Sequence, residues 1–486
     1  MNRRSRRAGA QRGALVRRGL VVVLGIVAAV AITSSLQRPA AATPRAPGPS
    51  LGSPLWSIRR TPQPVTDAVG AQHLQAALTA ATGGNRACFE VQTGGTLVAA
   101  ASPDTALTPA STIKLLTATA ALDQLGAEFH FTTTAQASGA PRNGTVDRLY
   151  LVGHGDPLLA SPERIAKDQQ DPETAGLAST PLVTLAERIK AAGITAIPGG
   201  IVGIDNRYES VRYAADWPAS TRIAIGPIGA LTVNDGYSGP AGSGGAVSDP
   251  ALNAATELTR LLKGLGVTAG ASSRGDAASK TETVASIDSP PLPLILTEML
   301  SASDNLTAEM LIRELGARTG DGTPAKGAGV VLDSMKALAV PTAGVTIVDG
   351  SGLSQRDAVP CQTLQAILAL TAQPKFAPVR EGLAIAGQRG TLAPRFVGTP
   401  LAGNLRAKTG TLSGVSGLAG FVTSDRLMTF SLLVNGSFGE STAFLTREAM
   451  VKAIASYPQT VSGADLDPGP NVPIPPRACP SADLAC

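Results

Sequence analysis

Three short motifs that combine hydroxyl, amine and amide side chains follow one another along this chain of 486 residues. They are Ser111-Thr112-Ile113-Lys114, Ser303-Asp304-Asn305 and Lys408-Thr409-Gly410. A serine hydroxyl is a poor nucleophile at neutral pH and needs a neighbouring base to take its proton as it attacks. Residues three apart in a helix lie on one face, so Lys114 could approach Ser111. The set indicates acyl transfer by a serine whose base is a lysine.

Lys114 can act as a base only when its amine is neutral. At an ordinary pKa of about 10.4, on the order of one lysine in two thousand is neutral near pH 7. Burial or a second cation must therefore lower this pKa, and Lys408 could be such a cation. The alternative is that Ser111 only caps a helix and Lys114 is a solvated surface charge.

The second motif adds a hydroxyl and an amide two positions apart. Ser303 could relay a proton to the leaving amine, and the Asn305 amide could hold both a substrate carbonyl and the lysine. The alternative is an ordinary loop and helix cap before Leu306.

The third motif would place a cation and hydroxyls on a strand edge, a pairing that suits a substrate carboxylate. Gly410 would let the backbone approach the substrate, and the amides of Thr411 and Ser111 could stabilise a tetrahedral oxyanion. The alternative is a hairpin with one exposed lysine. We expect catalytic roles for Ser111, Lys114, Ser303, Asn305 and Lys408, and substrate binding by Thr409, Gly410 and Thr411.

The elements that must position these residues alternate between helices and strands. Apolar spacing with Pro109 at the start and Gly126 at the stop predicts a helix that carries the first motif. Two glycines between strand-like runs predict a hairpin of 87–91 with 96–100. Further helices are expected at 71–82, 249–265, 293–300, 307–316 and 441–457, and further strands at 148–152, 200–204, 230–233, 405–408, 416–422 and 427–435.

Almost 190 residues separate Lys114 from Ser303, far more than a compact connection needs. This gap predicts an inserted domain at 142–290. The core would then comprise 65–141 and 291–460, with a Pro-rich spacer at 37–64 before it and a Pro-rich tail at 461–486 after it.

The N-terminus reads as an export segment. Seven arginines lie in the first 18 residues and precede an uncharged, mostly apolar run from Gly19 to Leu36. Residues 1–36 are therefore expected to be a cytoplasmic arginine-rich stretch followed by a signal anchor or a signal peptide, and Ala40 to Ala42 offer a cleavage site. The bulk of the chain is expected in the cell envelope, outside the cytoplasmic membrane, anchored or secreted.

Composition excludes several other classes. Without the seven arginines the chain has 34 basic and 36 acidic residues, so the overall charge of +5 gives no support for nucleic-acid binding. Neither a C-x-x-C nor an H-E-x-x-H motif occurs, and no metal or other cofactor is expected. Its three histidines, His73, His130 and His154, are expected to be structural or surface residues. The four cysteines, Cys88, Cys361, Cys479 and Cys486, suit an oxidising compartment and leave three pairings open.

The motif set resembles the class C low-molecular-mass penicillin-binding proteins, D-alanyl-D-alanine carboxypeptidases and endopeptidases with domains inserted between the first two motifs. Residues 149–157, 231–236, 349–354 and 390–392 are similar to further signatures of that family, and the likeness covers roughly residues 65–457. His154 stands where the family more often has glycine.

The resemblance implies an α/β fold: a penicillin-binding transpeptidase core, in which helices flank an antiparallel five-stranded sheet, with an inserted domain. It also implies peptidoglycan stem peptides ending in D-Ala-D-Ala as substrates, an acyl-enzyme on Ser111, and covalent inhibition by β-lactams. A serine β-lactamase is an alternative, but the glutamate arrangement that drives deacylation in class A enzymes is missing between Leu306 and Lys408. The other alternative is a cell-wall binding protein with an inactive acyltransferase fold.

Overall fold

The computed structural model describes residues 63–239 and 241–458. The predicted leader, nearly all of the predicted spacer and the predicted tail lie outside the described residues. Within the described ranges, every helix is too short or too polar to cross a membrane.

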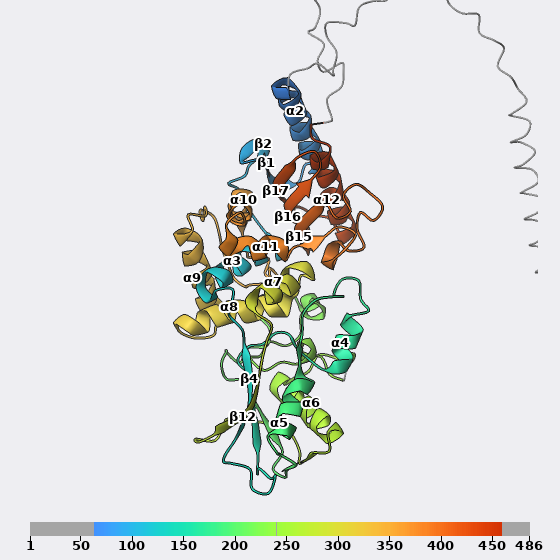
Figure 1. The fold of residues 1–486 in the computed structure, drawn as a ribbon. Coiled ribbons are helices and arrows are strands. Elements are labelled where there is room, and N and C mark those ends of the chain that lie inside the picture. The colour runs from blue at the N-terminus through green and yellow to red at the C-terminus, as the bar shows by residue number, and fades with distance from the viewer. Residues whose placement is uncertain (1–62, 240, 459–486) are drawn as a thin grey trace, which may run out of the picture. The chain divides into compact units, whose positions relative to one another are not determined.

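The core is built on an antiparallel sheet with the strand order β14-β15-β16-β17-β1-β2 (Figure 1). The strands are β1 (Arg86–Thr93), β2 (Thr96–Ala101), β14 (Ala384–Ile385), β15 (Leu405–Leu412), β16 (Val415–Thr423) and β17 (Leu427–Asn435). The predicted hairpin is confirmed as β1 and β2. The sheet has six strands where five were expected, because the buried two-residue β14 pairs with the outer edge of β15.

Side chains alternate between the two faces of this sheet, as the period of a strand requires. On β17, Phe430 and Leu432 belong to the apolar cluster that includes residues of α2 and α12. Leu433 belongs to the opposite cluster, with residues of α3 and α10. The sheet is therefore buried on both faces.

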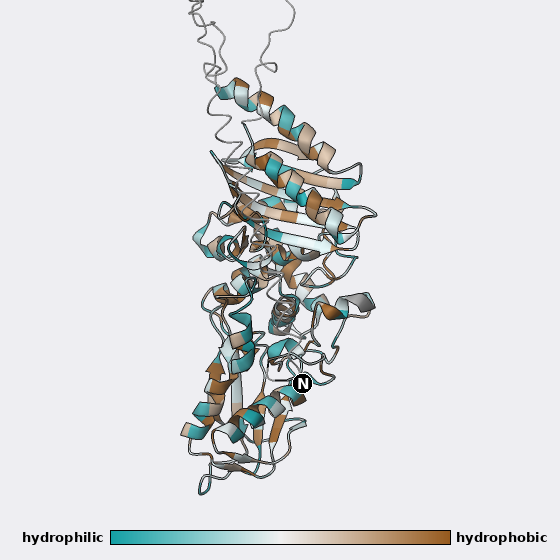
Figure 2. Ribbon diagram, turned by 90° about the vertical axis from the view of Figure 1, so that its right-hand side faces the viewer, coloured by the Kyte–Doolittle hydropathy of each residue, from teal (hydrophilic) through white to brown (hydrophobic). Residues whose placement is uncertain are grey.

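Helices cover each face of the sheet. One face packs against α2 (Gln63–Ala81) and α12 (Glu440–Ala455). The other contributes to the cluster formed by α3 (Lys114–Leu125), α7 (Leu292–Ser301), α8 (Asn305–Thr319), α9 (Pro324–Ala337), α10 (Cys361–Leu370) and α11 (Ala377–Glu381). Figure 2 shows hydrophobic and hydrophilic residues mixed along α2. The buried residues of this helix, Gly70, Leu74 and Leu78, are four apart and therefore lie on one face.

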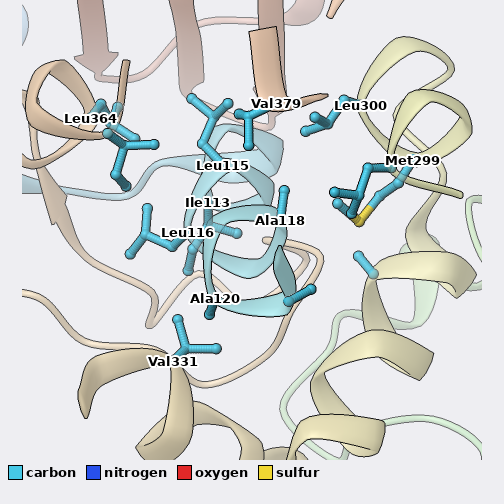
Figure 3. Packing of buried hydrophobic residues seen from close by; sticks show 14 of the residues in the cluster. Ile113, Leu115, Leu116, Ala118, Ala120, Met299, Leu300, Val331, Leu364 and Val379 are labelled. Atoms are coloured by element: carbon cyan, nitrogen blue, oxygen red, sulfur yellow. The ribbon is translucent and has the colours of Figure 1, made fainter. Parts of the chain in front are cut away.

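Helix α3 lies inside this second layer. Nine of its twelve residues are buried, including Lys114 at its first position. Ile113, Leu115 and Leu116 pack among side chains of α7, α9, α10 and α11 (Figure 3). Because the helix is surrounded, the polar groups at its N-terminus are fixed relative to the rest of the core.

The segment between the first two motifs forms a second sheet with the order β11-β9-β5-β4-β12. Its strands are β4 (Thr132–Ala137), β5 (Leu149–Val152), β9 (Ile201–Ile204), β11 (Ser273–Arg274) and β12 (Glu282–Asp288). An apolar cluster joins this sheet to α5 (Leu182–Ala191) and α6 (Pro250–Gly264). The short helix α4 (Pro162–Asp168) precedes α5. Four two-residue strands complete this segment: β6 (Leu159–Ala160), β7 (Thr180–Pro181), β8 (Ala196–Ile197) and β10 (Thr268–Ala269).

Two features of this segment differ from the sequence expectations. The sheet begins with β4, ten residues before the expected boundary at 142. The strand predicted at 230–233 is wrong: this apolar run has no strand partner and leads into the 3₁₀ turn η4, Asn234–Gly236. All four of its side chains are buried. The hydrophobic pattern therefore indicated buried residues and not residues that pair with a neighbouring strand.

A disulfide joins Cys88 of β1 to Cys361 at the start of α10. It closes a loop of 273 residues and resolves one pairing that the sequence left open. Both cysteines are fully buried in the layer that contains α3.

Replacing Cys88 and Cys361 together by alanine is expected to lower the free energy of unfolding by about 2–5 kcal/mol, because the unfolded chain loses a long-range constraint. Urea unfolding followed by circular dichroism would measure the loss. Reduction of the wild-type protein should give a similar shift, and equal midpoints for the oxidised wild type and the variant would contradict the prediction.

Candidate active site

Ser111 lies in the one-turn 3₁₀ helix η2, Ala110–Ile113, that leads into α3. The preceding residue, Ala110, is fully buried with a φ of 47°. Gly352 explains how that turn is accommodated, since a Cβ on this glycine would lie 2.1 Å from the Ala110 carbonyl oxygen. The sharp turn directs the Ser111 side chain towards a cleft rather than along the helix.

Lys114 lies directly behind Ser111 and is fully buried. Its Nζ is 3.0 Å from Ser111 Oγ, 2.7 Å from Asn305 Oδ1 and 2.6 Å from the Ser351 carbonyl oxygen. Asn305 and Ser351 each accept one hydrogen of the amine. When Lys114 is neutral, its lone pair is therefore left facing the Ser111 hydroxyl.

Burial lowers the pKa of Lys114 to about 8, although the carboxylates of Asp304, Asp349, Glu309 and Glu298 oppose the shift. At pH 7 about one Lys114 in ten is then neutral, against one in two thousand for an exposed lysine. Desolvation is the first cause of the lowered pKa and is one of the two causes that the sequence left open.

The second motif lies where α7 ends and α8 begins. Ser303 has a φ of 64°, and Asp304 caps α8 by accepting a hydrogen bond from the Thr307 amide at 2.6 Å. Asp304 is therefore a helix cap, as the alternative interpretation of this motif stated. Its neighbours Ser303 and Asn305 instead accept hydrogen bonds from the lysines of the other two motifs. Ser303 Oγ accepts a hydrogen bond from Lys408, and Asn305 Oδ1 accepts one from Lys114.

The third motif lies within β15. Lys408 is fully buried and donates to Ser303 Oγ at 2.8 Å and to the Thr409 carbonyl at 2.9 Å. Burial lowers its pKa well below the usual value, and the charges of Lys114 and Arg447 lower it further. Thr409 Oγ1 is 3.0 Å from the hydroxyl of Thr391.

Gly410 was expected to let the backbone approach the substrate, but in the structure it lets β15 approach the turn that carries Ser111. A Cβ at this position would lie 2.6 Å from the Pro109 carbonyl oxygen and 3.1 Å from Thr112 Cγ2. Side chains alternate along β15, so position 410 faces the turn that carries Ser111 while Thr409 and Thr411 face the cleft. The glycine brings the strand against the nucleophile turn.

The cleft has a volume of about 710 Å³. Ser111, Ser303, Asn305, Thr409 and Thr411 all line it. Lys114 and Lys408 lie behind the residues that line the cleft. They donate hydrogen bonds to the hydroxyls of Ser111 and Ser303, which do line it. The structure therefore brings all the predicted site residues to one place, and a cleft of this size can enclose a short peptide.

A loop that the motifs did not assign holds Lys114. Residues 349–354 supply the Ser351 carbonyl, and Asp349 accepts hydrogen bonds from the amides of Ser351, Gly352 and Ser354. Glu309 of α8 accepts from the amides of Gly350 and Ser351. The sequence Asp-Gly-Ser-Gly-Leu-Ser was the signal for this loop, but it did not reveal that a main-chain oxygen would orient the lysine.

The segment between the first two motifs also contributes to the site. Trp217 Nε1 donates to Asp349 Oδ2 at 2.7 Å, and the Ala224 carbonyl accepts from Asn305 Nδ2 at 2.8 Å. The second contact fixes the Asn305 amide with its oxygen towards Lys114. No sequence pattern pointed to this contact, because residues 212–228 have no regular spacing.

The histidines play no part in the cleft. The ring of His154 is 2.8 Å from the Thr132 carbonyl through Nδ1, and burial lowers its pKa. Among the described residues, His, Cys, Asp and Glu side chains form no group suited to a metal ion.

The chain is similar to known carboxypeptidases. The model of the D-Ala-D-Ala carboxypeptidase 3 (S13) family matches residues 70–243 and 238–457. A carboxypeptidase of Mycobacterium tuberculosis is 34% identical over 345 residues, which are 68% of this chain and 72% of that protein. Carboxypeptidase DacB of Mycolicibacterium smegmatis is 31% identical over 442 residues, or 86% of this chain and 91% of that protein.

The fold is similar to a solved structure as well. Penicillin binding protein 4 (dacB) from Haemophilus influenzae superposes with a TM-score of 0.65 at 22% identity, covering 78% of this chain and 99% of that one. The family match spans most of the described residues and includes all three motifs. The chain therefore belongs to the D-Ala-D-Ala carboxypeptidase 3 (S13) family.

Proposed function

We propose that this protein is a serine D-alanyl-D-alanine carboxypeptidase/endopeptidase that acts on peptidoglycan stem peptides through an acyl-enzyme. The observation that carries the proposal is the 3.0 Å contact between Lys114 Nζ and Ser111 Oγ, made by a buried amine with a lowered pKa. A lysine in that state can take the serine proton near neutral pH. Membership of the S13 family and the carboxypeptidase names of its relatives support the substrate class.

In the acylation step, neutral Lys114 accepts the Ser111 proton while Oγ attacks the carbonyl carbon of the penultimate D-alanine. The main-chain amides of Ser111 and Thr411 stabilise the oxyanion. The carbon–nitrogen bond then breaks, and the departing amine takes the proton that Lys114 had accepted, by way of the Ser303 hydroxyl, so that Lys114 is neutral again. Lys408 supports that relay because it donates to Ser303 Oγ and leaves the hydroxyl proton directed away from itself.

In the second step, neutral Lys114 takes a proton from water as the water attacks the ester, and this proton passes to Ser111 Oγ when the ester bond breaks. A β-lactam would enter the same first step, and its acyl-enzyme would persist if water attacks it slowly. Asn305 holds the lysine, while Thr409 and Thr411 bind the terminal carboxylate at the other end of the cleft. These assignments rest on the hydrogen bonds to Lys114 and Lys408 and on the residues that line the cleft.

We further propose that residues 65–141 and 291–460 form the catalytic domain and that the segment between them is an inserted domain. The separate sheet β11-β9-β5-β4-β12 supports an insertion, and because β4 (Thr132–Ala137) belongs to that sheet, we propose that the first boundary of the insertion lies near residue 132 rather than at 142. We also propose that residues 1–36 export the chain to the cell envelope and either anchor it or are removed. A C-terminal reporter that functions only in the cytoplasm should then be inactive, and an active one would contradict export.

The proposed function is tested by incubating purified protein with a stem pentapeptide that ends in D-Ala-D-Ala and with a cross-linked dimer of stem peptides. Mass spectrometry should detect release of one alanine from the pentapeptide or cleavage of the cross-link. Penicillin should add its mass to the protein at Ser111. If the protein cleaves neither peptide and is not acylated, the alternative of an inactive binding protein is correct, while sustained fast hydrolysis of a cephalosporin would indicate a β-lactamase.

A further inference from the structure

Arg447 is a buried cation that no motif includes. It lies on α12 beneath β15, and its side chain is 95% buried. Its Nη1 donates to the Gly410 carbonyl at 2.8 Å, to Thr411 Oγ1 at 2.8 Å and to the Gly417 carbonyl at 3.4 Å. Its Nη2 is buried without a hydrogen-bond partner.

Among the described residues, Arg447 is not ion-paired, although the carboxylate of Glu440 on the same helix attracts its charge from a longer distance. In the part of the chain that the structure describes, no carboxylate lies within ion-pair distance of its guanidinium. Instead, the guanidinium stacks on the Phe444 ring at 4.6 Å, and a second cation, Arg395, lies 4.0 Å from the same ring. Burying a charge without an ion pair is unfavourable, so its retention points to an anion that arrives from outside.

The Thr411 hydroxyl links this charge to the cleft. A guanidinium has no lone pair, so Arg447 can only donate to Thr411 Oγ1, and the hydroxyl proton must point elsewhere. No described residue accepts that proton in a hydrogen bond, and Thr411 lines the cleft. Thr411 is therefore held as a donor aimed at whatever occupies this end of the cleft.

We propose that Arg447 is a positioning residue that makes the cleft select peptides with a free terminal carboxylate. It fixes the Thr411 hydroxyl as a donor to that carboxylate, and it adds a positive charge to a cleft whose lining also contains Glu173, Glu440 and Glu448. The inference rests on the proposed function, because it concerns the terminal carboxylate of the same substrate. Lys408 contributes too little to this charge on its own, since its ammonium faces Ser303 and is itself destabilised by Arg447.

The test compares two peptides that differ only at the C-terminus, one ending in D-Ala-D-Ala carboxylate and the other in the carboxamide. For Arg447→Met we expect kcat/KM for the carboxylate to fall about 10- to 100-fold while that for the carboxamide changes little, as loss of a charge-assisted hydrogen bond implies. Thr411→Val should lose the same preference for the carboxylate peptide over the carboxamide peptide. When Thr411 is already valine, the additional change Arg447→Met should have little further effect on this preference.

The matched control is Arg380→Met, which also removes a guanidinium stacked on a phenylalanine, here 4.7 Å from the Phe421 ring. It should leave the preference unchanged. If Arg447→Met does not fold, Arg447→Lys is the test variant. One ammonium group cannot make the same set of hydrogen bonds as the guanidinium, so the preference for the carboxylate peptide should fall at least several-fold. An equal fall for both peptides, or an unchanged preference, would overturn the proposal, whereas a wild type that cleaves neither peptide would overturn the proposed function itself.

Discussion

The Ser111→Ala variant is expected to lose at least about 10⁴-fold in the rate of D-alanine release and to form no covalent adduct with penicillin. Among the described residues, Ser111 Oγ is the only nucleophilic side-chain atom within hydrogen-bond distance of the Lys114 amine, and such knockouts in serine hydrolases cost losses of this order. The measurements are kcat/KM on the pentapeptide and the intact mass of the protein after penicillin treatment.

Folding should not account for this loss. Ser111 is half-buried, and Lys114 keeps its hydrogen bonds to Asn305 and Ser351 when the hydroxyl is removed. The matched control is Ser424→Ala, which removes an exposed hydroxyl from the turn between β16 and β17. Adduct formation by Ser111→Ala at a rate near that of the control would assign the nucleophile to another residue and would contradict the mechanism.

The Lys114→Met variant is expected to acylate about 10³- to 10⁴-fold more slowly, because Ser111 then has no base at hydrogen-bond distance. Methionine fills a similar volume and avoids burying a charge, but it leaves Asn305 Oδ1 and the Ser351 carbonyl without their donor. These two effects on stability oppose each other, so the melting temperature should change much less than the rate.

The pH dependence distinguishes a basic lysine from a merely structural one. With its pKa at about 8, the neutral fraction of Lys114 grows tenfold per pH unit below 8 and is nearly complete above 9. The wild-type acylation rate should therefore rise with pH and level off near that value. The rising limb should disappear in Lys114→Met and persist in Lys336→Met, which removes an exposed lysine paired with Asp333. A wild-type rate that is flat between pH 6 and 9 would exclude proton transfer to this amine as the limiting step.

Much of the core was predictable because its elements are signalled locally. The helix that carries Lys114 was predicted from its apolar spacing, its initial proline and its terminal glycine, and α3 confirms it with Ser111 in a preceding 3₁₀ turn. The hairpin of β1 and β2 follows from two adjacent glycines, Gly94 and Gly95, both with positive φ. Such signals depend on a few residues that are neighbours in the sequence, so they can be recognised without knowledge of the tertiary structure.

The remaining properties depend on which parts of the chain pack against a residue in the folded protein. The apolar run 230–233 is buried without forming a strand, since apolar composition reports burial and not hydrogen-bond partners. The space beside Gly410 is filled by the nucleophile turn, which only the packing of β15 on that turn reveals. For the low pKa of Lys114 the sequence left burial and a second cation open, and burial is the first cause, because a sequence does not state how much water a side chain retains.

By itself, the sequence determined which residue types the chemistry uses and in which order they come: a serine with a lysine one helical turn away, a second hydroxyl with an amide, and a lysine beside threonines. Only the tertiary structure decided that Asn305 and the Ser351 carbonyl orient the lysine, that Ala224 sets the direction of the Asn305 amide, and that the unpaired charge of Arg447 underlies Thr411. The physical reason is that proton transfer and desolvation depend on distances of about 3 Å between atoms that are hundreds of residues apart in the chain. Local spacing can specify a helix face, but these distances are set by packing of the whole core.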